Sequence, residues 1–204
     1  MYAFFRCVAE AIVEKGVRGL VEMVPGGAFA CDVAGAAWKK YRERRKADEI
    51  REEVQQIAQA TFAEALGAAA QAAQETLPPT ATVEDTLNLE LVLSQVPGAV
   101  RASLKRPEDA SGRSVPSGFV LNSPDDLAKM LPGRPPRFKP NDPVPGLAGW
   151  SLVEPLGSGG FGEVWLARHR SMSSLRGAVK FCHGEQARDL KHESDLIDRV
   201  MATG

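Results

Sequence analysis

Apolar residues recur at helical spacing through the first hundred residues of the 204-residue chain. In residues 2–23 large apolar side chains alternate with charged ones at intervals of about one helical turn, which predicts an amphipathic helix. The turn-forming residues at 24–27 end this helix, and a second, long helix is expected from Phe29 to Glu53. Thr61-Phe62-Ala63-Glu64 matches a capping box, so another helix is expected to begin there.

Residues 63–75 are rich in alanine, which favours a helix but offers little apolar bulk to bury. We expect this segment to be an exposed or loosely packed helix, or a spacer, and to end before Pro78. Residues 83–93 begin with acidic side chains and fit a helix, although their alternating leucines also fit a strand. We predict two short helices divided near Pro97, so that residues 1–105 form an all-helical module.

A basic run, residues 39–46, lies inside the expected long helix. Such a run could bind acidic lipid or nucleic acid. Acidic residues between positions 48 and 53 follow at helical spacing and can pair with it, so a solvated helix face is the preferred interpretation. The formal net charge of −1 gives no further reason to expect nucleic acid or an anionic membrane as a partner.

The composition changes between residues 106 and 149, where prolines recur at short intervals. Proline removes backbone donors and blocks regular elements, so we predict a linker that is extended or disordered for much of its length. One short helix is expected near residues 124–131. Ser123 can cap it, Pro124 suits its first position, and acidic residues follow in its first turn.

Two strands are expected on either side of a glycine-rich turn. Residues 150–156 and 163–168 have the apolar character of strands, and Gly157, Gly159 and Gly162 lie between them. Glycine lets a phosphate chain approach the backbone and permits turns that direct N–H groups at oxygens. A dinucleotide-binding fingerprint requires a helix directly after the glycines, and a P-loop ends in Gly-Lys-Ser/Thr, so neither fits this pattern.

Residues 176–182 are expected to form a third strand, whose apolar run contains Lys180. A lysine amid an apolar strand is unfavourable unless it meets an anion. An amphipathic helix is expected from Glu185 to Met201, and Glu193 lies near its buried stripe. A strand lysine paired with a glutamate of the next helix would hold the ammonium against phosphate oxygens. Glu185 is the second choice for that partner.

Residues 150–204 thus resemble the start of a protein kinase domain of the bacterial Ser/Thr type. The pattern G-x-G-x-x-G-x-V is matched through Val164, and Gly177-Ala178-Val179-Lys180 is similar to the family's V-A-I-K strand. The chain is therefore expected to be α+β. It would consist of the helical module, the proline-rich linker over 106–149 and, as the resemblance implies, part of a kinase N-lobe with antiparallel strands and the αC helix.

The resemblance also implies a binding site for ATP, with Mg²⁺ in the full-length family. Leu156, Val164 and Ala178 would line the adenine pocket, and Lys180 would meet the α- and β-phosphates. The expected nucleotide-binding residues are Leu156, Gly157, Ser158, Gly159, Gly160, Phe161, Gly162, Val164, Ala178, Lys180 and Glu193.

The family's H-R-D-x-x-x-x-N, D-F-G and A-P-E motifs do not occur in these 204 residues. Phosphoryl transfer needs the catalytic-loop Asp and the metal ligands. The chain is therefore expected to be the ATP-binding portion of a Ser/Thr protein kinase, inactive by itself, and its standing as an enzyme is left open. The alternative is a non-catalytic interaction or regulatory protein that acts through residues 1–105. A protein substrate or partner is implied only for the full-length family.

Three widely spaced cysteines, Cys7, Cys31 and Cys182, have the spacing of neither a disulfide framework nor a zinc site. This favours a reducing cytoplasm. The N-terminal residues do not form a signal sequence, because charges interrupt the apolar run early. No uncharged run is long enough to span a bilayer.

Overall fold

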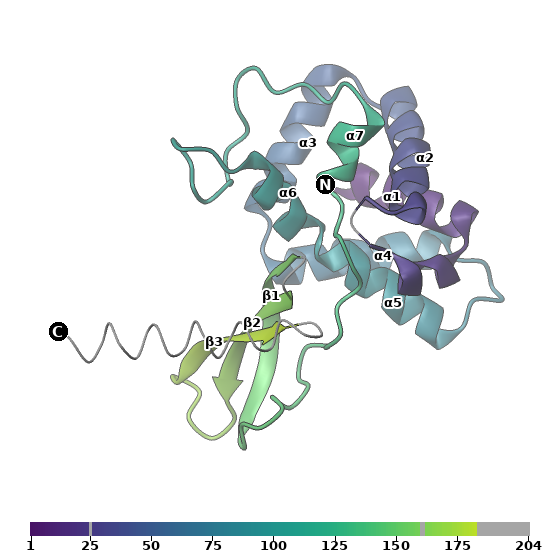
Figure 1. The fold of residues 1–204 in the computed structure, drawn as a ribbon. Helices are drawn as coiled ribbons and strands as arrows, with labels where there is room; N and C mark the ends of the chain where they lie inside the picture. The colour runs from purple at the N-terminus through teal and green to yellow at the C-terminus, as the bar shows by residue number, and fades with distance from the viewer. Residues whose placement is uncertain (25, 160–161, 183–204) are drawn as a thin grey trace. The chain divides into compact units, whose positions relative to one another are not determined.

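The computed structural model describes residues 1–24, 26–159 and 162–182. It is mixed α and β, as predicted, and the chain divides into two compact units, residues 1–139 and 140–204. The first unit contains α1 (Tyr2–Lys15), the 3₁₀ helix η1 (Val17–Glu22), α2 (Ala28–Arg44), α3 (Ala47–Gln59), α4 (Phe62–Thr76), α5 (Val83–Ser94), α6 (Val96–Leu104) and α7 (Pro124–Ala128) (Figure 1). The second contains β1 (Trp150–Gly159), β2 (Gly162–His169) and β3 (Arg176–Cys182), which form an antiparallel sheet in that order.

The first predicted helix, residues 2–23, is divided at Gly16. Gly16 has φ 98°, a backbone conformation that residues with a side chain rarely adopt, and α1 ends there before η1 begins. The capping box of α4 is confirmed, because Thr61 accepts from the N–H of Glu64 and the Glu64 carboxylate accepts from the N–H of Thr61 at 2.8 Å. Helices α5 and α6 confirm the helical interpretation of residues 83–104 and exclude the strand.

The long helix predicted from Phe29 to Glu53 is two helices, so that prediction was wrong. Helix α2 ends at Arg44, because Arg45 and Lys46 have extended backbone conformations. The acidic residues that follow occupy the first turn of α3, where carboxylates stabilise the positive end of the helix dipole. These acidic residues mark the start of a new helix, whereas from the sequence we expected them to continue one long charged helix.

Ion pairs of the basic run connect α2 to α1. Lys40 lies 3.1 Å from Glu14, and Arg44 lies 2.9 Å from Glu10. Arg45 pairs, as expected, with acidic residues that follow it in α3. Two of the cations are therefore used in holding two helices together, which the sequence did not predict.

The alanine-rich helix α4 is a packing element. Its inner face consists of alanines with no exposed surface, namely Ala65, Ala69, Ala72 and Ala73. The helix packs against α1 and α5. Small side chains allow helices to approach one another closely, so this face needs no apolar bulk to be buried. The expectation of an exposed or loosely packed helix was wrong.

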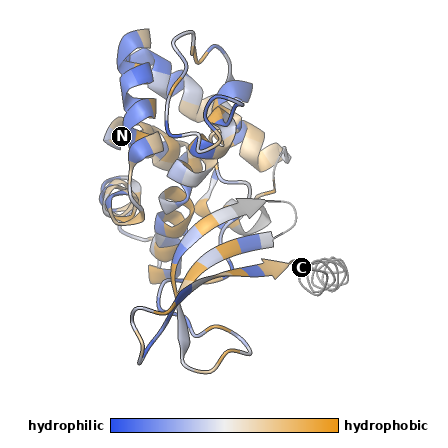
Figure 2. Cartoon of the chain, turned by 90° about the vertical axis from the view of Figure 1, so that its left-hand side faces the viewer, coloured by the Kyte–Doolittle hydropathy of each residue, from blue (hydrophilic) through white to orange (hydrophobic). Residues whose placement is uncertain are grey.

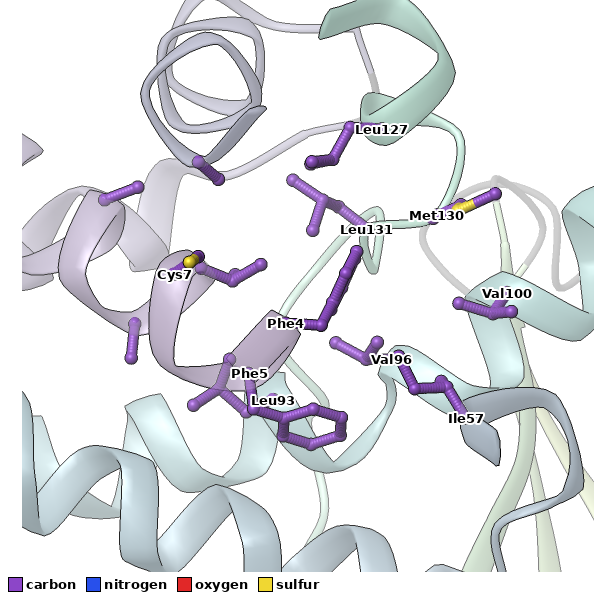
Figure 3. Packing of buried hydrophobic residues seen from close by; sticks show 14 of the residues in the cluster. Phe4, Phe5, Cys7, Ile57, Leu93, Val96, Val100, Leu127, Met130 and Leu131 are labelled. Atoms are coloured by element: carbon purple, nitrogen blue, oxygen red, sulfur yellow. The ribbon is translucent and has the colours of Figure 1, made fainter. Parts of the chain in front are cut away.

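The first part of the predicted linker also packs into the helical core. Side chains of residues 115–131 join the cluster formed by α1 to α6, namely Val115, Leu121, Leu127, Met130 and Leu131. Figure 3 shows Leu127, Met130 and Leu131 among the residues of this cluster. The predicted short helix is present as α7, and Ser123 caps it by accepting from the N–H of Asp126 at 3.2 Å. Prolines prevent long regular elements here, but they do not prevent the apolar residues between them from being buried.

The last residues of the predicted linker belong to the sheet unit. Residues 141–144 run beside the start of β1 and share backbone hydrogen bonds with it. The N–H of Leu152 donates to the carbonyl of Asp142 at 2.9 Å, and the N–H of Val144 donates to the carbonyl of Trp150 at 3.0 Å. In the described part of the chain, no helix is both long and apolar enough to cross a membrane.

A buried carboxylate, Glu53 of α3, joins three helices. It accepts hydrogen bonds from the Tyr41 hydroxyl of α2 at 2.8 Å and from the N–H of Phe4 in α1 at 3.0 Å. It also lies 2.7 Å from the α-amino group of Met1. Burial raises the pKa of the Glu53 carboxyl, but these donors favour its charged form more strongly, so the pKa lies below its usual value.

Replacing Glu53 with Gln is expected to destabilise the helical unit by about 2 kcal/mol or more, because its buried donors lose a charged acceptor. Urea unfolding followed by circular dichroism at pH 7 measures this loss. The matched control is Glu52→Gln, which changes an exposed neighbour and should alter the free energy of unfolding by less than about 0.5 kcal/mol.

The Glu53 contribution is also expected to depend on pH. Its pKa is lower in the folded protein than the reference value of 4.5, so the contribution is complete above pH 4.5 and is lost as the pH falls through the folded pKa. The difference between wild type and Glu53→Gln should therefore shrink in acid. Equal stability of the two proteins at pH 7 would contradict the assigned role.

Candidate functional site

The glycine motif lies where β1 reverses into β2. In the antiparallel register Gly157 is opposite Val164, and Gly159 is opposite Gly162. A register shift just before Gly157 is typical of a β-bulge, which re-aims a side chain and increases the local twist. Leu156 lies at this irregularity and is 49% exposed, so an apolar side chain is presented to solvent beside the glycines.

One row of residues crosses all three strands next to the glycine turn. Gly157 on β1, Val164 on β2 and Lys180 on β3 lie directly opposite one another. Two positions further from the turn along β2 and β3, Ala178 is opposite Leu166. Residues two apart on a strand point to the same face, so Val164, Ala178 and Lys180 share one face of the sheet. The register thus brings together three of the residues predicted from sequence.

The opposite face of the sheet is the buried one. Leu152, Trp165 and Ala167 are almost completely buried, and along β2 the buried positions 165 and 167 alternate with more exposed ones. Figure 2 shows that hydrophobic and hydrophilic residues also alternate along the strands of the sheet. Glu163 is also buried on this face, where its carboxylate accepts a hydrogen bond from the Trp165 indole N–H at 2.9 Å. The face that carries Lys180 is the more open of the two, with Ala178 and Lys180 exposed and Val164 half-buried.

The exposure of Lys180 corrects one step of the sequence argument. A lysine in an apolar strand was expected to need an anion to compensate for its burial. The Lys180 side chain is exposed, so burial imposes no such requirement. Its register opposite Val164, next to the glycine turn, is now the observation that connects it with the motif.

Two of the motif glycines are subject to different constraints. Gly162 has φ 142°, and a Cβ placed on it would lie 1.9 Å from the Phe181 carbonyl oxygen, so the fold itself requires glycine there. A Cβ on Gly157 would meet no atom within 4 Å. The fold leaves open space at Gly157, and that space lies on the row that contains Lys180.

Several predicted site residues cannot be placed. Gly160, Phe161 and Glu193 lie outside the described residues, as does Glu185. The expected ion pair between Lys180 and the helix that follows it therefore stays a prediction. Ser158 lies in β1 opposite Glu163, between two of the motif glycines.

Leu166 was not among the residues predicted for the site. It is half-buried and lies opposite Ala178, two residues beyond Val164, so it extends the apolar part of the same face. The sequence of β2 could have indicated this, because residues two apart on a strand share a face, so Leu166 lies on the same face as Val164.

Comparisons with protein-family models, with curated proteins and with solved structures found no match for this chain. Within the described residues, no group of three or more His, Cys, Asp or Glu side chains is arranged to hold a metal ion. The interpretation of the site therefore rests on its own geometry.

Alanine substitutions at Gly162 and Gly157 are expected to differ in their effect on the stability of the sheet. Gly162→Ala should destabilise the sheet by about 1–3 kcal/mol, because the new Cβ overlaps a backbone carbonyl at a positive φ. Gly157→Ala should leave the sheet nearly unchanged. Amide hydrogen exchange of residues 164–182 measures the difference, since a loss of about 2 kcal/mol speeds global exchange roughly thirtyfold. Similar exchange rates in the two variants would contradict this division.

Proposed function

We propose that residues 150–182 form the nucleotide-binding hairpin and third strand of a protein-kinase-like N-lobe of the Ser/Thr type, and that this chain binds ATP. The observation that carries the proposal is the register that aligns Gly157, Val164 and Lys180 in one row. A glycine-rich hairpin occurs in many folds, whereas a hairpin with a lysine of the next strand beside its glycines matches a nucleotide flap.

The order of groups along the open face supports one orientation of the nucleotide. From the turn outward the face presents the glycine backbone, then the Lys180 cation beside Val164, then the apolar pair Ala178 and Leu166. Successive rows on one face are about 6–7 Å apart. An ATP molecule with its phosphates at the turn and its base over the apolar rows would match this order, with Leu156 as a further apolar contact.

The proposed roles follow from this orientation. Backbone N–H groups of residues 158–162 would donate to phosphate oxygens, and the space at Gly157 would admit the phosphate chain. Lys180 would contact the α- and β-phosphates, and Glu193 would hold its ammonium in position. The catalytic-loop and metal-binding motifs of the family do not occur in these 204 residues, so the function proposed for the chain itself is binding.

The helical unit supports a second candidate function, that of a non-catalytic interaction or regulatory module. Its residues have their own continuous core, from Phe4 in α1 to Leu131 after α7. A unit with its own core can fold and bind independently of a neighbouring domain. The two functions are compatible, since they concern different parts of the chain.

Titration with Mg-ATP is expected to shift the amide NMR signals of residues 156–166 and 176–182, with a Kd of about 0.1–1 mM. The affinity should be weak because one open face buries a small part of the ligand. Lys180→Met should weaken binding at least about fivefold through loss of a charge-assisted contact.

The matched control for this titration is Arg176→Met. It removes the same charge from the same exposed face of β3, about 13 Å further from the turn, and should change the Kd less than about twofold. Equal effects of the two variants would indicate nonspecific attraction of the nucleotide and would overturn the proposed site. A Kd in the low micromolar range would contradict the expectation of weak binding.

The 204-residue chain is expected to transfer no phosphate from Mg-ATP to itself or to a general protein substrate, because it supplies no catalytic-loop Asp and no D-F-G metal ligand. A radiolabelled ATP assay measures this directly. Transfer above background that disappears in Lys180→Met would show that other residues perform the chemistry.

A further inference from the structure

A cavity of about 320 Å³ lies in the helical unit at the junction of α2 and α3. Its lining includes Arg45 and Lys46, at the chain reversal where one helix ends and the next begins. Residues 119–121, from the segment between α6 and α7, also line it. The volume lies at the lower end of the range that small-molecule sites occupy.

The charged residues that line this cavity are all cationic: Arg42, Arg45 and Lys46. Within the described residues Arg42 and Lys46 make no ion pair, and the Arg42 guanidinium lies over the Trp38 ring at 5.6 Å. Arg45 is partly neutralised by acids of α3, at 3.7 Å and 3.8 Å. The cavity therefore retains positive charge.

The N-terminus of α3 adds to this field. Its N-cap residue is Lys46, whose side chain has no acceptor atom, so it cannot satisfy the first N–H groups of the helix. Those N–H groups and the dipole of this 13-residue helix favour an anion. Asp48 and Glu49 stand in the same turn, but neither lines the cavity, and Glu49 is engaged by Arg45 and by the N–H of Lys46 at 3.3 Å.

The rest of the cavity wall is apolar. Ile50 and Leu121 are buried, and Phe119 is half-buried against the core. Val120 is 53% exposed, although it belongs to the wall of a cavity. An occupant that covers Val120 would gain apolar contact area while its charge meets the cations.

We propose that this cavity binds a small amphipathic anion, namely an organic phosphate monoester or carboxylate attached to an aromatic or short alkyl group. Such a ligand satisfies both halves of the lining, with the anion at Lys46 and Arg42 and the apolar group against Phe119 and Val120. The inference does not depend on the nucleotide site in the sheet unit.

The surroundings disfavour a polyanion as the occupant. Nucleic acid or an anionic membrane surface needs a continuous basic surface. Two cations of the basic run are instead paired with α1, since Lys40 contacts Glu14 and Arg44 contacts Glu10. The positive charge that is left lines a pocket of limited volume that also has apolar lining residues, which suits a small ligand.

The test is an NMR titration of the whole chain with phenyl phosphate, inorganic phosphate and benzyl alcohol in parallel. Phenyl phosphate is expected to shift the amides of residues 42–50 and 119–121 and to bind at least about tenfold more tightly than either of the other two, because each of them offers half of the contacts. Inorganic phosphate binding as tightly as phenyl phosphate would reduce the site to a simple anion contact and overturn the proposal. Absence of localised shifts with all three probes would also overturn it.

Variants in matched pairs locate the site. Lys46→Gln should weaken phenyl phosphate binding at least about fivefold, whereas Lys39→Gln, an exposed lysine of α2 outside the cavity, should change it less than about twofold. Val120→Ser tests the apolar wall, and Val83→Ser at the exposed start of α5 is its control. Equal effects within either pair would contradict the assignment.

Lys180→Met separates this proposal from the nucleotide proposal. It should leave phenyl phosphate binding unchanged if the ligand occupies the helical cavity. Loss of binding in this variant would place the ligand in the sheet unit and overturn the cavity as its site.

Discussion

The carboxylate of Glu53 connects α1, α2 and α3 inside the apolar core. Apolar contacts are non-directional, so they do not by themselves select one relative position of two helices by hydrogen-bond geometry. A buried charge is different, because it is unfavourable unless donors surround it in a defined geometry. The Tyr41 hydroxyl and the N–H of Phe4 supply such donors from two other helices. The core and the cavity at the end of α2 thus depend on this arrangement.

The sheet unit depends on a different constraint, the register of three strands. A shift of one residue would exchange the two faces of a strand and move Trp165 from the buried face to the open one. The close approach of Gly162 to the Phe181 carbonyl leaves no room for a side chain, which limits the residues that fit this register. The alignment of Val164 with Lys180 is therefore a product of packing on the face that carries neither of them.

The sequence predicted those features that are local in the chain. The capping residues Thr61 and Ser123, the three strands and the short helix α7 depend on neighbours within a few residues. Longer-range features were missed. The reversal at residues 45–46 has no Gly or Pro to mark it, and the burial of the alanine face of α4 depends on helices distant in sequence.

For the candidate site, too, the sequence indicated local features but not the exposure of individual positions. Spacing suggested that the glycines and Lys180 belong together, and pairing across strands then showed which residues share a face. The desolvation argument for Lys180 failed because a sequence gives the chemical character of a strand but not the exposure of each of its positions. The cationic cavity was missed because residues 119–121, which also line it, lie about sixty positions beyond α3 and were assigned to an extended linker.

Gly157 and Gly162 differ in how far the fold constrains them, so the two positions can change to different degrees during evolution. Folding alone would keep glycine at 162, because any side chain there meets the Phe181 carbonyl. Folding places no such demand on position 157, because a Cβ there would meet no atom within 4 Å. Of these two positions, 157 is therefore the one at which the fold tolerates a side chain, so its glycine could be replaced without loss of the sheet's stability.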